Sequence, residues 1–126
     1  MDQDMEAQLY RLTRQLKDLN QAAYRQFTER TQQENDQADF YREIKPFADH
    51  MQILIDKWRP LAEKWAAFER PAHLFPVQIK DTYDNLAIVC VTAFQKDTRK
   101  RRFYETIKSI DYVLDTMLQA TSERHV

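Results

Sequence analysis

Residues 44–68 decide the fold, and they read IKPFADHMQILIDKWRPLAEKWAAF. Apolar side chains recur in this stretch at alternating steps of three and four residues, at Ile44, Phe47, Met51, Leu54, Trp58, Leu61, Trp65 and Phe68. Because an α-helix has about 3.6 residues per turn, this spacing places the apolar side chains along one side of a helix. We therefore predict an amphipathic helix over residues 39–69. We expect a bend near Pro46 and a kink near Pro60, since a proline removes a backbone hydrogen bond and restricts the preceding residue.

Three other stretches carry the same spacing. Their apolar positions are Met5, Leu9, Leu12, Leu16, Leu19 and Ala23, then Ile79, Tyr83, Leu86, Cys90 and Ala93, then Phe103, Ile107, Ile110, Leu114 and Met117. They predict helices over residues 3–30, 76–96 and 98–121, with Pro76 at the start of one helix and Asp97 or Thr98 capping the next. Residues 86–94 could form a buried strand by composition, but a single strand would leave its backbone unpaired. The prediction is an all-α, four-helix up-down-up-down bundle that forms one domain over residues 1–126.

Composition excludes several functional classes. The sequence contains no glycine, which excludes glycine-rich phosphate-binding loops. A single cysteine, Cys90, excludes an intramolecular disulfide and a cysteine-based zinc cluster. The net charge of −1 gives no overall attraction to nucleic acid or anionic lipid. The first residues resemble no secretory signal and the longest apolar run is too short to cross a bilayer, so we expect a cytoplasmic protein without membrane contact.

Residues for catalysis or metal binding form no recognisable motif. A di-iron bundle would require Glu-x-x-His pairs, which are missing, and the three histidines, His50, His73 and His125, are far apart in sequence. Cys90 lies in an apolar run and is expected to be buried and protonated. We therefore predict no catalytic residue, no metal ligand and no cofactor. A metal- or small-ligand-binding bundle that brings His50 close to Asp111 remains an alternative.

Aromatic and acidic residues in or beside the predicted core could have either a structural or a functional role. Trp58 and Trp65 could stack on a planar ligand, but their spacing favours the core. Tyr24 lies outside the apolar side of its helix and would suit an interface. Asp111 flanks the core of the last helix, where a carboxylate could act as an acid or base. We expect it instead to bond a tyrosine or pair with an arginine.

A basic turn is the most unusual feature of the sequence. Five of the seven residues from 96 to 102 are basic, namely Lys96, Arg99, Lys100, Arg101 and Arg102. Lys96 is expected at a helix C-terminus, whereas the other four fall at the positive end of the next helix, where each costs a few tenths of a kcal/mol. The leading hypothesis is a non-catalytic helical protein that docks an acidic protein partner through this turn or through a bundle face. A nucleic-acid-binding module that uses the turn is the alternative, and oligomeric state stays open.

A family resemblance supports the same fold. The segment Asp39-Phe40-Tyr41-Arg42-Glu43-Ile44-Lys45-Pro46 resembles part of the YppE-like family of small Gram-positive bacterial proteins, which carry a domain of unknown function. The similarity continues through Trp65, Arg70-Pro71, Ile79 and Lys100-Arg101-Arg102-Phe103. The resemblance implies a four-helix bundle. It implies no activity and no functional residues.

Overall fold

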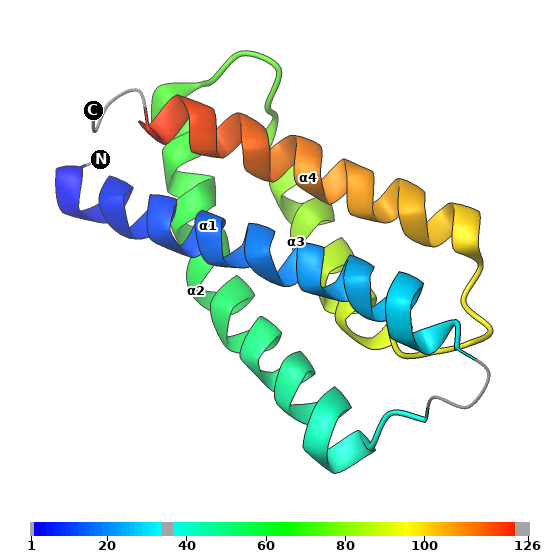
Figure 1. The fold of residues 1–126 in the computed structure, drawn as a ribbon. Helices are drawn as coiled ribbons and strands as arrows, with labels where there is room; N and C mark the ends of the chain where they lie inside the picture. Colours follow the sequence, from blue (N-terminus) through cyan, green and yellow to red (C-terminus); the bar gives the residue numbers. More distant parts are fainter. Residues whose placement is uncertain (1, 34–36, 123–126) are drawn as a thin grey trace.

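The computed structural model describes residues 2–33 and 37–122 of the chain. Four α-helices make up most of this part: α1 (Gln3–Arg25), α2 (Lys45–Glu69), α3 (Pro76–Thr92) and α4 (Lys100–Ser122) (Figure 1). A π-helical segment, Gln26–Thr31, extends α1, and a second, Phe40–Ile44, precedes α2. No strand occurs among the described residues. The middle of the first predicted connection and the C-terminal tail with His125 lie outside them.

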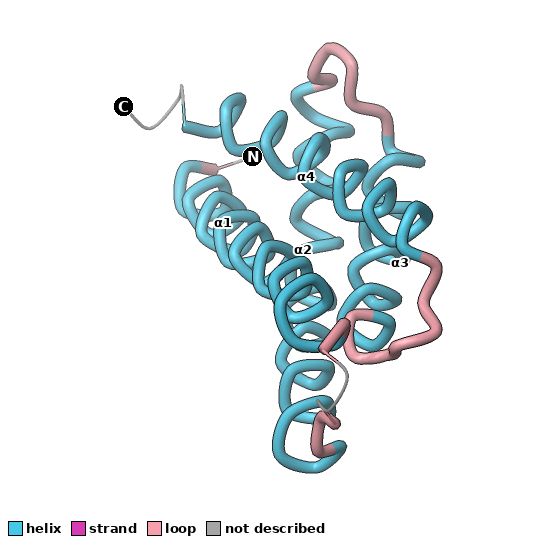
Figure 2. The backbone as a smooth tube through the Cα atoms, turned by 45° about the vertical axis from the view of Figure 1, so that its right-hand side comes forward, coloured by secondary structure: helices cyan, strands magenta, loops and turns pink. Residues whose placement is uncertain are grey.

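The helices form the predicted up-down-up-down bundle. Successive helices run in opposite directions, and α1 packs against both α2 and α4 (Figure 1, Figure 2). Helix α3 packs against α2 and α4 and closes the ring of four. The apolar stretch that could have formed a strand is therefore a helix, in which Leu86 and Val89 are buried.

The buried stripe departs from a strict alternation of three and four residues. Asn20 is fully buried in place of Leu19, and Ala62 in place of Leu61. Phe68, predicted in the core, is 70% exposed. An alternation of three and four has a period of 3.5 residues, whereas a straight helix has 3.6, so the buried side drifts by about 20° per heptad. The prediction of Phe68 as a core residue was wrong for this reason.

Both proline positions in the second helical region are helical. Lys45, which precedes Pro46, has φ −61° and ψ −47°, so it lies in the α region that the residue before a proline tends to avoid, and the chain passes from π- to α-helical hydrogen bonding there. Asp39 caps the π-helical segment, because its Oδ1 accepts a hydrogen bond from the backbone N–H of Arg42 at 2.9 Å. Pro60 lies inside α2 without ending it, and Figure 1 shows the axis of α2 changing direction about midway.

The connection between α2 and α3 uses positive φ angles without glycine. Arg70 ends α2 in the left-handed region, with φ 45°, and His73 has φ 65°. Left-handed geometry disfavours residues with a Cβ atom, so both positions carry local strain. Helix α3 then begins at Pro76, as predicted.

The connection between α3 and α4 begins earlier than predicted. Helix α3 ends at Thr92, not at residue 96, so Lys96 lies in the connection and not in a helix. The side chain of Thr98 is used at the end of α3 and not as a cap of α4. Its hydroxyl donates to the backbone oxygen of Thr92, the last residue of α3, at 2.9 Å. Tight turns follow Thr92, with Gln95 N donating to the Thr92 oxygen at 3.1 Å, and these turns end the α-helical hydrogen bonding.

Candidate functional site

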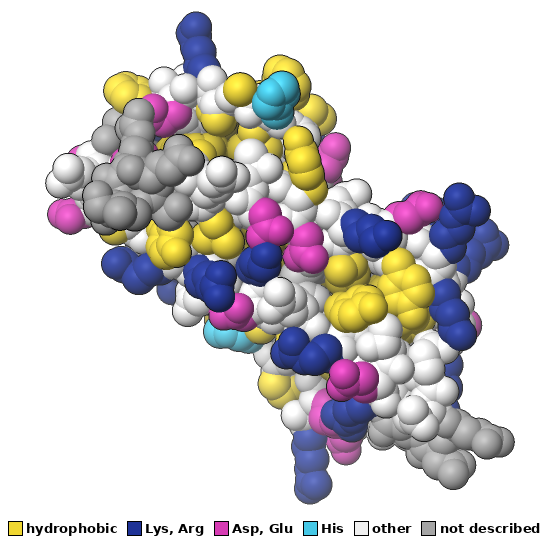
Figure 3. All heavy atoms as spheres, turned by 45° about the horizontal axis from the view of Figure 1, so that its top comes forward, with side chains coloured by type: hydrophobic (Ala, Val, Ile, Leu, Met, Phe, Trp, Pro, Cys, Tyr) yellow, Lys and Arg dark blue, Asp and Glu magenta, His cyan; other side chains and the backbone are white. Residues whose placement is uncertain are grey.

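The basic turn lies at one end of the bundle, where the connection after α3 leads into α4. Lys96 is exposed in the connection, Arg99 immediately precedes α4, and Lys100, Arg101 and Arg102 form its first turn. The backbone is held by a hydrogen bond from Phe103 N to Arg99 O at 3.0 Å. Figure 3 shows Lys and Arg side chains gathered at this end of the molecule.

Among the described residues, one of the four cations from Arg99 to Arg102 forms an ion pair. Arg101 Nε lies 3.1 Å from Glu105 Oε1, but the two side chains are 93% and 65% exposed, so the pair contributes little. Arg99, Lys100 and Arg102 are exposed and form no ion pair within residues 2–33 and 37–122. An intramolecular ion pair therefore neutralises only Arg101 among the four residues from Arg99 to Arg102, within the described part of the chain.

A cleft of about 250 Å³, here called the basic cleft, adjoins the turn between α3 and α4. Arg99 and Arg102 line one side, and Asp97 lies on the connection. Ile88 from α3 also lines the cleft and is 53% exposed, while Phe103 forms a buried part of the wall. The cleft thus combines two guanidinium groups with an accessible apolar surface.

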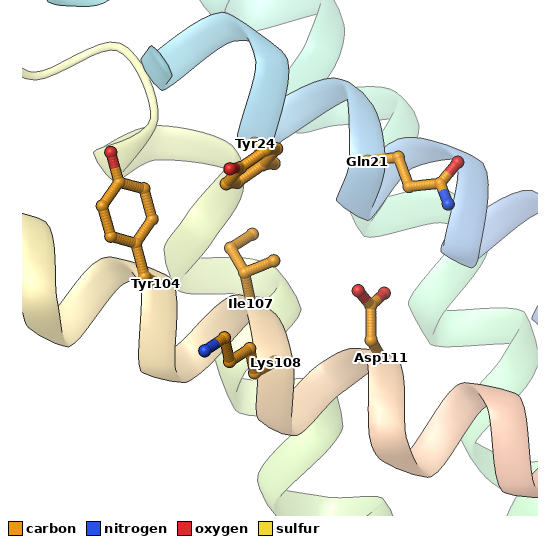
Figure 4. A pocket seen from close by; sticks show the side chains of 6 residues that line it. All are labelled: Gln21, Tyr24, Tyr104, Ile107, Lys108 and Asp111. Atoms are coloured by element: carbon orange, nitrogen blue, oxygen red, sulfur yellow. The ribbon is translucent and has the colours of Figure 1, made fainter.

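A second cleft, of about 370 Å³, lies between α1 and α4 and is here called the α1–α4 cleft. It is lined by Gln21, Tyr24, Tyr104, Ile107, Lys108 and Asp111 (Figure 4). The Tyr24 and Tyr104 rings meet edge to face, with centroids 5.8 Å apart. Asp111 was expected to bond a tyrosine or an arginine, but within the described residues its hydrogen-bond partner is Asn20, whose Nδ2 donates to Asp111 Oδ1 at 2.9 Å.

The groups considered for metal binding and nucleophilic catalysis are separated or buried. His50 is exposed on α2 and His73 is exposed in the connection before α3. Within the described residues, no three His, Cys, Asp or Glu side chains cluster as metal ligands, so His50 and Asp111 do not form such a group. Burial raises the pKa of the Cys90 thiol to about 11, which leaves it protonated near neutral pH.

Sequence reasoning identified some residues of the α1–α4 cleft but not the cleft itself. Tyr24 was a candidate interface residue and Asp111 a candidate acid or base, but the two lie 87 residues apart in the sequence and were considered separately. Asn20 was missed because polar residues are seldom buried, and it is fully buried here. One signal could have predicted its burial. Asn20 directly follows Leu19, an expected core residue, and the buried side of a helix drifts along its length.

Comparison with known proteins gives a family and a fold. The family described as a bacterial domain of unknown function, DUF1798, matches residues 13–121. A crystal structure of a protein of unknown function from Listeria innocua superposes with a TM-score of 0.89 at 26% identity, covering 96% of each chain. No curated protein matches.

Two structures of YppE from Bacillus subtilis have the same fold. The crystal structure gives a TM-score of 0.86 at 21% identity, covering 94% of this chain and 96% of YppE. The solution structure gives 0.84 at 21% identity, covering 100% and 98%. Among the described helices, none is both long enough and apolar enough to span a membrane. Because the family match extends over most of the sequence, the chain belongs to the bacterial DUF1798 family, whose domain has no known function.

Proposed function

We propose that this protein is a non-catalytic interaction module that binds an acidic segment of a protein partner through the basic turn. The observation that carries the proposal is the exposure of Arg99, Lys100 and Arg102 without an ion pair in the described part of the chain. Three cations that form no ion pair within the described residues are available to carboxylates of a partner.

The position of these cations makes a purely structural role unfavourable. The N-terminus of a helix carries a partial positive charge, so each cation in the first turn of α4 costs about 0.3–1 kcal/mol at low ionic strength. Lys100, Arg101 and Arg102 occupy this turn. An acidic partner would offset the cost in the complex, whereas the isolated bundle gains nothing from it.

The basic cleft indicates what else the partner segment contains. Ile88, which is 53% exposed, lies on the same cleft as Arg99 and Arg102. Interfaces derive much of their affinity from an apolar anchor surrounded by polar contacts. The fitting segment therefore carries acidic residues next to one apolar side chain. A cytoplasmic location fits this proposal, because a lone buried thiol suits a reducing compartment.

The test is affinity capture from a nuclease-treated lysate of the source bacterium. Wild-type protein is compared with a variant that carries glutamine at Arg99, Lys100, Arg101 and Arg102. A matched control carries glutamine at four exposed basic residues elsewhere, Arg11, Arg14, Lys57 and Lys64. The two variants lose the same charge, so they separate a local contact from an effect of net charge.

We expect a discrete protein to be captured by the wild type and the control but not by the basic-turn variant. Direct binding of that purified protein should then weaken as salt rises. Capture that is equal for all three proteins, or no capture, would overturn the proposal. In a parallel capture from untreated lysate, retention that nuclease treatment removes would point instead to nucleic acid, whose affinity falls steeply with salt.

A further inference from the structure

The α1–α4 cleft is built by residues that the basic turn does not use. Its six lining residues come from the C-terminal end of α1 and from the first half of α4. A volume of about 370 Å³ falls within the roughly 300–1,000 Å³ of small-molecule sites. Its lining combines two tyrosine rings and an aliphatic side chain with a carboxylate, an ammonium group and an amide, so an apolar surface lies beside a few polar groups.

Helical spacing sets the length of the cleft. Tyr104, Ile107 and Asp111 are three and four residues apart on α4, so they follow one face of the helix over about 10 Å. Gln21 and Tyr24 are three apart on α1, which runs in the opposite direction. Figure 4 accordingly shows the two tyrosines at one end of the cleft, Ile107 between, and Asp111 and Gln21 at the other end.

The carboxylate of Asp111 is oriented by a buried side chain. Asn20, which is fully buried, donates through Nδ2 to Asp111 Oδ1 at 2.9 Å and to Ile107 O at 3.2 Å. The Asn20 amide therefore fixes the carboxylate against α1 and leaves Asp111 Oδ2 without a hydrogen bond among the described residues.

The charge of Asp111 has no counterpart in the described part of the chain. Asp115, one turn further along α4, pairs with Lys17 of α1. Asp111 forms no such ion pair, although Lys108 is three residues away and lines the same cleft. Figure 4 shows the Lys108 ammonium turned toward the tyrosine end, away from Asp111. A half-buried carboxylate without a cation is a site for a positive group.

The tyrosine end is a supported apolar surface. Tyr104 is held by an edge-to-face contact with buried Phe27, with centroids 6.0 Å apart. Tyr24 leans edge to face against Tyr104 and remains 44% exposed. Tyrosine rings attract apolar and aromatic groups, and their faces also attract cations.

From these contacts we infer that the α1–α4 cleft binds an organic cation with an aromatic or aliphatic body. Its ammonium group pairs with Asp111, and its body lies along Ile107 against Tyr24 and Tyr104. An anion would meet the uncompensated carboxylate, and a neutral compound would leave that charge unpaired. The inference is independent of the partner proposed for the basic turn.

The experiment compares 2-phenylethylamine with its neutral analogue 2-phenylethanol, followed by amide chemical shifts of the isotope-labelled full chain. We expect the amine to perturb residues 20–24 and 104–111 and to bind about two- to fivefold more tightly than the alcohol at low salt, as an ion pair of this exposure predicts. Equal affinities, shifts elsewhere, or no shifts at millimolar amine would overturn the inference.

Two variants change the charge of the cleft in opposite directions. Asp111→Asn retains an oxygen that can accept from Asn20, so the fold is kept while the charge is lost, and the preference for the amine should disappear. Lys108→Gln removes the competing cation and should increase amine affinity about two- to threefold, as expected for a solvent-exposed charge. If both variants weaken amine binding equally, Asp111 does not recognise the cation. An unchanged spectrum outside the cleft verifies that each variant is folded.

Discussion

The indole Nε1 of Trp58 donates a hydrogen bond to the Thr13 hydroxyl over 3.0 Å inside the core. Both residues are buried, at 0% and 1% exposure, and the same hydroxyl donates to Leu9 O at 2.7 Å. One threonine therefore accepts from α2 and donates within α1. This bond fixes the packing of one of the two core tryptophans against the first helix.

Replacing Thr13 with valine should destabilise the bundle. Valine has nearly the same shape but cannot accept the indole N–H, and a buried unsatisfied donor costs about 1–3 kcal/mol. We expect a loss of this size in the free energy of unfolding, measured by urea denaturation with tryptophan fluorescence. Thr13→Ser retains the hydroxyl and should lose less. A valine variant as stable as the wild type would show that the bond contributes nothing.

Replacing Asn20 with aspartate should make stability depend on pH. The variant puts a second carboxylate within hydrogen-bond distance of Asp111, which raises the pKa of the pair in the folded state. A raised folded-state pKa favours folding at low pH, and this advantage is lost as pH rises through it. Relative to Asn20→Ala, the aspartate variant should therefore be less stable near pH 7 and recover near pH 4. Parallel pH profiles for the two variants would contradict this prediction.

Cys90 should be unreactive in the folded protein. Its thiol is buried, it donates to Ala87 O at 3.1 Å, and burial raises its pKa to about 11. A disulfide reagent such as DTNB should react much more slowly at about pH 8 with the native protein than with urea-unfolded protein, since the thiolate is the nucleophile. Equal rates in the two states would mean that the thiol is accessible.

The same pKa predicts a loss of stability in alkali. The unfolded thiol ionises near its ordinary pKa, whereas the folded thiol stays protonated until about pH 11. Stability from the protonated thiol is therefore complete below the unfolded pKa and is lost as pH rises toward the folded value. Urea midpoints should fall more between about pH 8 and pH 10 for the wild type than for Cys90→Ala, which cannot ionise. A steeper fall for Cys90→Ala would contradict the assignment.

Apolar spacing predicts the helices of this bundle because burial of one side is what orders them. Met51, Leu54 and Trp58 are buried as the spacing requires. Phe68 is not, because small departures of the helix from a 3.5-residue period accumulate along α2. The backbone geometry of the connection before α3 could not be predicted either. Arg70 and His73 take positive φ angles, which are expected mainly at glycine.

The two candidate sites differ in how far the sequence predicts them. The basic turn is contiguous in sequence, so Lys96, Arg99 and their neighbours were found without a structure. The α1–α4 cleft requires Tyr24 from one helix and Tyr104 from another, and their side chains meet only after the bundle closes. A single sequence records the charge of Asp111 but not whether a cation lies beside it.

Reversing charge at the basic turn should stabilise the fold while removing binding. Each reversal removes an unfavourable cation and adds a favourable anion in the first turn, so Lys100→Glu with Arg102→Glu should raise the free energy of unfolding by about 0.6–2 kcal/mol per site at low salt. The gain should shrink in high salt, where exposed charges are screened. Lys57→Glu, in the interior of α2, is the control and should not give this gain. Urea denaturation at two salt concentrations measures both effects. A double variant that is less stable than the wild type would show that the basic turn supports the fold itself, and its exposed cations would no longer indicate a partner.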